Sequence, residues 1–170
     1  ARYRGKDIIL GPGVNIIRTP LCGRNFEYMS EDPCVIEKMA PELVKGIESQ
    51  DTAACVKHYC LNNQEYDRGR VNVEVSDRAL HEIYLRGFYT AVIAGGASSV
   101  MGAYNRYKNE HMCHNSYLVK DLLKGKWGFK GVYLSDWAGA HDTDECIRNG
   151  LDIEMGTNKP YNEYYMADAM

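Results

Sequence analysis

Apolar runs and polar intervals alternate along the chain and predict strands and helices in turn. Short runs rich in β-branched and aromatic residues, bounded by glycines or polar residues, are typical of buried strands. Such runs occupy residues 8–16, 53–57, 98–103, 131–134 and 151–153. They are apolar throughout instead of alternating, which indicates strands that are covered on both faces.

Between these runs, apolar residues recur at intervals of three or four, which predicts amphipathic helices. The first helix has Pro33 in its first turn, where proline is well tolerated. The second is capped by Ser76-Asp77, the third begins at Ser116 and stops at Gly125, and Gly150 closes a fourth. Strands that alternate with helices predict parallel βαβ units within one domain.

This alternation fits two α/β folds, an open doubly wound sheet and a (β/α)8 barrel. The glycine-rich phosphate turn of dinucleotide-binding folds is missing, because Gly11-Pro12-Gly13 lies within a strand candidate and no helix follows directly. A whole barrel takes about 250 residues, so 170 residues supply about five of its eight units. We therefore expect residues 1–170 to be part of a longer protein.

Composition is that of an ordinary soluble domain, with 45% hydrophobic and 25% charged residues. The formal net charge of -3 argues against nucleic acid or an anionic membrane as the main partner. No apolar run approaches the ~20 residues that a membrane helix needs.

The six cysteines have no regular spacing, and we expect them to be free thiols. Two stretches could in principle ligate zinc together, His58-Tyr59-Cys60 with His111-Met112-Cys113-His114. Both lack the paired Cys-x-x-Cys spacing of structural zinc sites, so we predict no metal.

Polar or ionisable side chains gather where the predicted strands end. In both candidate folds the active site lies at the carboxyl ends of the strands, so this convergence predicts an enzyme. The first strand is followed by Arg18 and Arg24, and the other four are closed by Lys57-His58, Tyr104-Asn105, Asp136-Trp137 and Glu154 in turn.

Ser135-Asp136-Trp137 is the strongest single indication of a site. It closes the apolar run 131–134, although aspartate is a poor strand residue that prefers turns and caps. Asp136 could cap a following helix instead, but a carboxylate at the end of a buried strand favours a catalytic role.

Motifs stand in order at residues 10–16, 20–33, 57–59, 62–65, 76–85, 101–105, 127–129 and 135–137. Together they resemble glycoside hydrolase family 3, the β-glucosidase group, from about Leu10 to Gly156. The resemblance implies that residues 1–170 are part of the N-terminal (β/α)8 TIM-type barrel domain of that family.

The resemblance also implies roles for individual residues. Asp136 matches the family's catalytic nucleophile, and positive groups nearby should lower its pKa. Substrate-binding roles are implied for Arg24, Lys57, His58, Arg68, Tyr104 and Trp137. For Arg68, which lies in a charged loop, a surface role is the alternative. We interpret Glu154 as a structural, hydrogen-bonded acid.

The implied reaction is retaining hydrolysis of terminal β-D-glucosides through a covalent glycosyl-enzyme intermediate on Asp136, without a cofactor. The substrate would be a β-glucoside or an oligosaccharide. Two family features have no counterpart here, namely a sugar-binding aspartate upstream of Leu10 and the acid/base glutamate, which C-terminal domains of the same chain supply. We therefore expect the 170-residue piece alone to have little or no activity.

Three alternatives stay open. Related xylosidases often carry Cys after the nucleophile, so Trp137 favours a glucosidase over a β-xylosidase. Lys57 could instead form a Schiff base in an aldolase-type barrel, with His58 and Tyr104 handling protons. A non-catalytic sugar-binding module is the third possibility.

Overall fold

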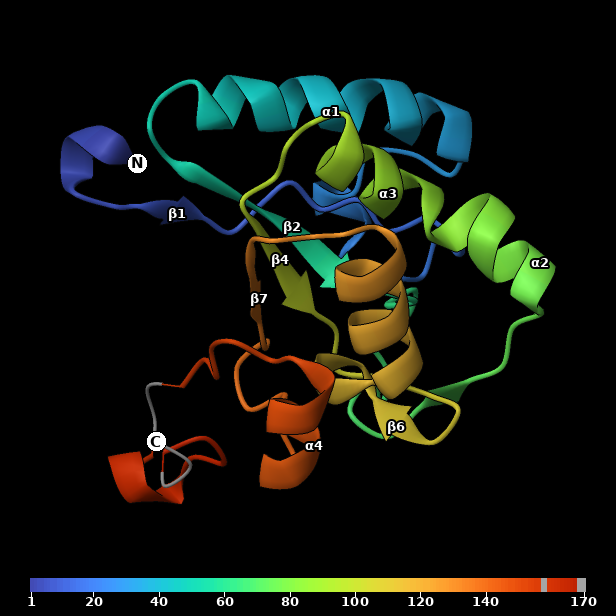
Figure 1. Cartoon of the computed structure of the whole chain (residues 1–170). Helices are drawn as coiled ribbons and strands as arrows, with labels where there is room; N and C mark the ends of the chain where they lie inside the picture. The colour runs from blue at the N-terminus through green and yellow to red at the C-terminus, as the bar shows by residue number, and fades with distance from the viewer. Residues whose placement is uncertain (157–158, 168–170) are drawn as a thin grey trace.

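The main sheet is parallel, and its strands follow one another in chain order. The computed structural model describes residues 1–156 and 159–167 (Figure 1). Within them the sheet has the order β1-β2-β4-β7, with bounds Ile8–Ile9, Ala53–Tyr59, Ser99–Gly102 and Val132–Leu134. A doubly wound sheet reverses its strand order at a switch point, so a sheet without reversal favours the barrel.

The helices connect these strands and cover the sheet. α1 and α3 pack against each other and against β2 (Figure 1). The α-helices are α1 Pro33–Glu48, α2 Asp77–Ala79, α3 Arg86–Ile93 and α4 Thr143–Asn149. Wider, π-type turns occupy Leu80–Tyr84 and Ser116–Lys126, and short 3₁₀ turns occupy Arg2–Arg4, Asn25–Glu27, Met112–His114 and Tyr161–Glu163.

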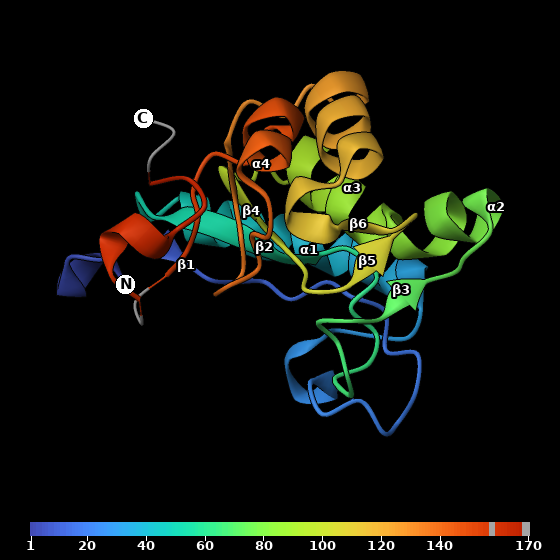
Figure 2. The same ribbon diagram turned by 90° about the horizontal axis from the view of Figure 1, so that it is seen from below.

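A second, small sheet contains β3 Asn72–Val73, β5 Arg106–Tyr107 and β6 Glu110–His111. In Figure 2, this small sheet lies well apart from β1. We did not predict this sheet, because strands of two residues leave no periodic signal.

Side chains that accept backbone N–H groups explain where the helices begin. Asp32 accepts from the amide of Cys34 at the start of α1. Ser76 accepts from Ala79 at the start of the second helical segment, as predicted. That segment is nevertheless divided into α2, a π-type turn and α3, and the helix predicted to stop at Gly125 continues to Lys126.

Two predicted strands are shorter than expected. Of residues 8–16, only Ile8–Ile9 form a regular ladder, because Gly11 and Pro12 interrupt it and proline has no amide proton. The segment still follows β2, since Lys57 donates to the carbonyl of Pro12 and Val14 donates to the carbonyl of Lys57. Residues 151–153 make a single bridge, from Ile153 to Leu134.

Both faces of the sheet are apolar, as predicted. Val56, Val100 and Tyr133 are buried in the main core, which the helices cover. Their chain neighbours Cys55, Met101 and Leu134 form a smaller buried cluster of their own. Because both faces of the sheet are covered by apolar side chains, its charged groups lie at the strand ends.

All six cysteines are free, as predicted, with Cys34 exposed and the others buried. In residues 1–156 and 159–167, no three His, Cys, Asp or Glu side chains are arranged to hold a metal ion. No helix in these ranges has the length and apolar character needed to cross a membrane.

Gly13 allows the chain segment before α1 to approach the sheet, because it bridges to both Tyr28 and Lys57. A Cβ at this position would lie 2.9 Å from the Glu27 carbonyl oxygen and 2.9 Å from the ring of Tyr28. We expect Gly13→Ala to destabilise the full-length protein by about 1–3 kcal/mol.

Gly46→Ala is the matched control, because a Cβ there meets nothing within 4 Å. It lies within α1, where alanine is favoured over glycine by about 0.5–1 kcal/mol. Thermal unfolding should show a lower midpoint temperature for Gly13→Ala but not for Gly46→Ala. Equal midpoints would mean that the close approach at Gly13 is not required.

Candidate active site

Asp136 lies two residues beyond the end of β7, with its side chain only 6% exposed. Its Oδ1 accepts a hydrogen bond of 2.9 Å from the backbone amide of Trp137. The hydroxyl of Tyr104, which follows β4, lies close enough to the same carboxylate to lower its pKa. His58 in β2 places Nε2 3.7 Å from Oδ2. Three neighbouring strands therefore contribute to one small cluster around a buried carboxylate.

Arg24 and Lys57 are joined by a residue that the sequence did not single out, Glu27. Lys57 Nζ lies 3.0 Å from Glu27 Oε2, and Arg24 Nε donates to Oε1 of the same carboxylate. The three side chains are 15–20% exposed. Burial raises the pKa of Glu27, but the hydrogen bonds from both cations outweigh it and leave that pKa below its usual value. Glu27 thus holds two cations in fixed positions.

Arg68 belongs to the cluster and is not a freely solvated surface residue. Its guanidinium carbon lies 4.3 Å from the centroid of the Tyr104 ring, within cation–π range. It also pairs with Glu65, three residues earlier. The substrate-site prediction for Arg68 is therefore consistent with its position.

Burial raises the pKa of Asp136 above its usual value. The amide of Trp137, the hydroxyl of Tyr104 and the charges of Arg24 and Arg68 oppose this effect without cancelling it. Our expectation of a lowered pKa is therefore wrong in direction, because the sequence shows the cations but not the depth of burial. Lys57 instead lowers the pKa of Glu27.

His58 is neutral. Burial lowers its pKa to about 2, with further lowering by the charges of Arg24, Lys57 and Arg68. Asn15 holds its backbone on both sides, accepting from the His58 amide at 2.7 Å and donating to its carbonyl at 2.9 Å. The backbone of His58 is therefore held in place, and its imidazole carries one proton.

The remaining predicted residues lie where the strand ends place them. Trp137 is 40% exposed, at the edge of the cluster beside Asp136. Glu154 accepts from the amide of Met166 at 2.9 Å, so it is a hydrogen-bonded acid as predicted. Glu27 and Glu65 were missed, although each lies three residues from an arginine of the predicted site, a spacing typical of ion pairs.

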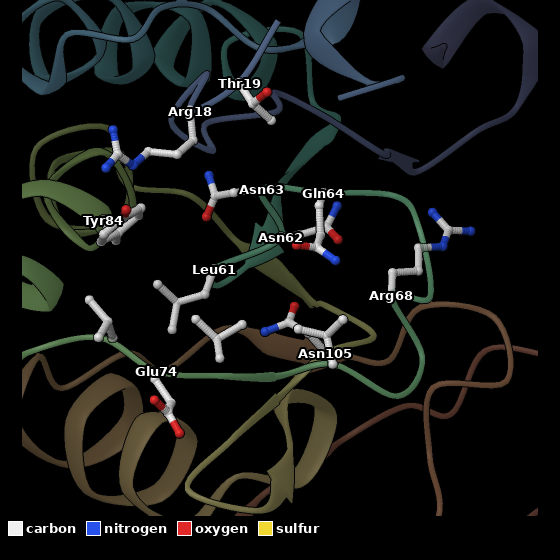
Figure 3. Close-up of a pocket in the computed structure, with 13 residues that line it drawn as sticks. Arg18, Thr19, Leu61, Asn62, Asn63, Gln64, Arg68, Glu74, Tyr84 and Asn105 are labelled. Carbon is white, nitrogen blue, oxygen red and sulfur yellow. The ribbon is translucent and has the colours of Figure 1, made fainter. Parts of the chain in front are cut away.

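A cavity of about 200 Å³ lies beside this cluster (Figure 3). Asn62 and Arg68, on the segment that follows β2, line it together with Asn105 from the chain after β4. Arg68 therefore has the cluster on one side and the cavity on the other.

The Trp137 amide, the Tyr104 hydroxyl and the charges of Arg24 and Arg68 all favour the ionised form of the Asp136 carboxylate. This suits an ionised oxygen that acts as a nucleophile, surrounded by groups that can bind hydroxyls.

Comparison with known proteins agrees with this arrangement. Residues 1–168 match the model of the glycosyl hydrolase family 3 N-terminal domain. The β-glucosidase BoGH3A of Bacteroides ovatus is 51% identical, over 98% of this chain and 23% of that protein. Thermostable β-glucosidase B of Acetivibrio thermocellus is 42% identical, over 96% of this chain and 22% of that protein.

Solved structures give the same result. β-Glucosidase 3B from Thermotoga neapolitana in complex with α-D-glucose superimposes with a TM-score of 0.88 at 47% identity, over 91% of this chain and 22% of that one. The chain thus spans less than a quarter of the length of these relatives. Its parallel sheet with covering helices is an incomplete (β/α)8 barrel, as predicted, and the chain belongs to glycoside hydrolase family 3.

Proposed function

We propose that this chain is the nucleophile-bearing part of a retaining glycoside hydrolase that acts on terminal β-D-glucosides. The observation that carries the proposal is the buried Asp136 carboxylate, which lies at a strand end among donors and cations. Relatives named as β-glucosidases support a glucoside substrate. An exo-α-(1→6)-L-arabinopyranosidase of Bifidobacterium breve is also 44% identical, so the sugar must be tested directly.

In the first step an oxygen of Asp136 attacks the anomeric carbon, while the bond to the leaving-group oxygen breaks and that oxygen receives a proton. Water then releases the sugar with overall retention of configuration. Arg24, Lys57 and His58 would bind the hydroxyls of the sugar, and the neighbouring Tyr104 hydroxyl would stabilise the Asp136 carboxylate.

The proton donor would come from outside residues 1–170. We propose that these residues are a partial domain of a longer protein, whose later domains supply the acid/base glutamate. No cofactor takes part in this reaction.

The test is hydrolysis of 4-nitrophenyl glycosides by the full-length protein, with β-glucoside, β-xyloside and α-L-arabinopyranoside compared. We expect the β-glucoside to react fastest, and NMR to show the β-anomer as the first product. A first product of inverted configuration would overturn the mechanism, and faster xyloside hydrolysis would favour the xylosidase. Glucose binding without any turnover would favour a sugar-binding module.

The 170-residue piece, assayed in parallel, should show little or no turnover, because loss of the proton donor alone costs orders of magnitude in rate. Full activity of the piece would contradict an acid/base residue in another domain.

The aldolase alternative has lost its support. A Schiff-base lysine must react as a neutral amine, whereas the Glu27 carboxylate 3.0 Å from Lys57 stabilises the charged ammonium. The family match also assigns the chain to a group of glycoside hydrolases.

Arg68 should affect the pH dependence of the reaction. Its charge lowers the pKa of Asp136, so Arg68→Gln should raise that pKa further. Because Asp136 must be ionised to attack, the acid limb of kcat/KM should move to higher pH. Arg68→Lys keeps the charge and should shift the limb less. An unmoved acid limb in Arg68→Gln would mean that Asp136 does not control it.

A further inference from the structure

The hydroxyl of Tyr28 lies between the site histidine and a buried amide. It is 3.1 Å from Nδ1 of His58 and 3.0 Å from Nδ2 of Asn62. Tyr28 is 6% exposed, and His58 and Asn62 are 2% exposed. These contacts are protected from water, so their hydrogen-bond directions can be worked out from donor and acceptor chemistry.

Glu65 determines which way the Asn62 amide faces. Nδ2 of Asn62 lies 3.1 Å from Oε1 of Glu65. The other carboxylate oxygen of Glu65, Oε2, accepts a hydrogen bond from Arg68. A carboxylate only accepts hydrogen bonds, so the NH₂ group of Asn62 must face it. The same NH₂ group therefore donates its second proton to the Tyr28 oxygen.

Tyr28 then has one proton to give, and Nδ1 of His58 is its partner. Burial raises the pKa of Tyr28, so the hydroxyl keeps its proton. With its oxygen already accepting from Asn62, the hydroxyl donates to Nδ1, which must carry a lone pair.

The other ring nitrogen leads to the same assignment. His58 is neutral and has one ring proton, because its pKa is lowered to about 2. Nε2 faces the Asp136 carboxylate at 3.7 Å, where an N–H is favourable and a lone pair is repelled. That distance exceeds a hydrogen bond, so the N–H is available to a ligand atom.

We propose that Tyr28 is a positioning residue that holds His58 in the Nε2–H tautomer, so that the histidine presents a donor beside Asp136. The tautomer follows from these contacts together with the neutral state of His58 and does not depend on the proposed function. Its use, donation to a hydroxyl of the bound sugar, rests on the proposed function.

The direct test is the proton position in the full-length protein, measured by ¹⁵N solid-state NMR with labelled histidine at neutral pH. The signal of His58 among the histidines of the full-length protein is assigned from its loss in His58→Gln. We expect a protonated Nε2 and an unprotonated Nδ1. A protonated Nδ1 in the wild type would overturn the proposal, whether or not the protein hydrolyses glycosides.

Tyr28→Phe removes the hydroxyl donor and keeps the ring. We expect protonated Nδ1 to become detectable at His58, and kcat/KM to fall about tenfold, the effect of one buried hydrogen bond. The matched control is Tyr133→Phe, which also loses a buried hydroxyl contact, 2.8 Å to the carbonyl of Met112. The control should leave the tautomer and kcat/KM unchanged.

An unchanged His58 tautomer with unchanged kcat/KM in Tyr28→Phe would overturn the positioning role. A changed tautomer in a protein without glycoside turnover would instead support the proposal and contradict the proposed function.

Discussion

Replacing Asp136 by asparagine is expected to lower kcat of the full-length enzyme about 10,000-fold or more. The asparagine side chain is nearly isosteric with aspartate, and its oxygen can still accept the hydrogen bond from the backbone N–H of Trp137. The local fold should therefore persist. The side-chain amide is not a nucleophile, however, and the covalent step has no substitute in the cluster. The measurement is steady-state hydrolysis of an aryl β-glucoside.

Asp142→Asn is the matched control. The Asp142 side chain also accepts a backbone N–H, from Glu145 at the start of α4, but it takes no part in the cluster. It should leave the rate nearly unchanged.

Azide added to Asp136→Gly should restore turnover and give α-glucosyl azide, because the small anion can occupy the space of the carboxylate. Asp136→Asn with more than a tenth of wild-type activity would show that the nucleophile lies elsewhere.

Glu27→Ala should lower kcat/KM about 100-fold, the cost expected when groups that bind substrate shift by about 1 Å. Without this carboxylate, Arg24 and Lys57 lose their common partner and repel each other in a site of low exposure. Steady-state kinetics with the aryl β-glucoside measures the effect.

Glu42→Ala is the control for Glu27→Ala. Glu42 pairs with Lys45 at 2.7 Å, but both side chains are more than half exposed, and such pairs contribute little. A change of less than twofold in kcat/KM for Glu27→Ala would remove Glu27 from the substrate site.

The fold was largely predictable because periodic apolar runs dominate the sheet and its helices. Three predicted strands, at 53–57, 98–103 and 131–134, are present with bounds that differ by a few residues. The exceptions have local causes. Gly11 and Pro12 break a run that is apolar but cannot form a continuous ladder, and the two-residue strands of the small sheet have no period to detect.

The predicted site residues lie together because parallel strands bring their carboxyl ends to one edge. Lys57, His58, Tyr104 and Asp136 follow this rule directly. Glu27, Tyr28 and Asn62 do not, because they lie on irregular segments whose course no periodicity reveals. The direction of the Asp136 pKa shift was missed for a related reason, since burial depends on packing by distant parts of the chain.

If Asp136 bonds covalently to the anomeric carbon, that bond can be trapped. The full-length enzyme is treated with a 2-deoxy-2-fluoro-β-D-glucoside bearing a good leaving group, and its peptides are mapped by mass spectrometry. We predict one fluoroglucosyl group, attached to Asp136. Attachment to another carboxylate, or turnover of β-glucosides with no covalent adduct formed, would mean that Asp136 is not the nucleophile.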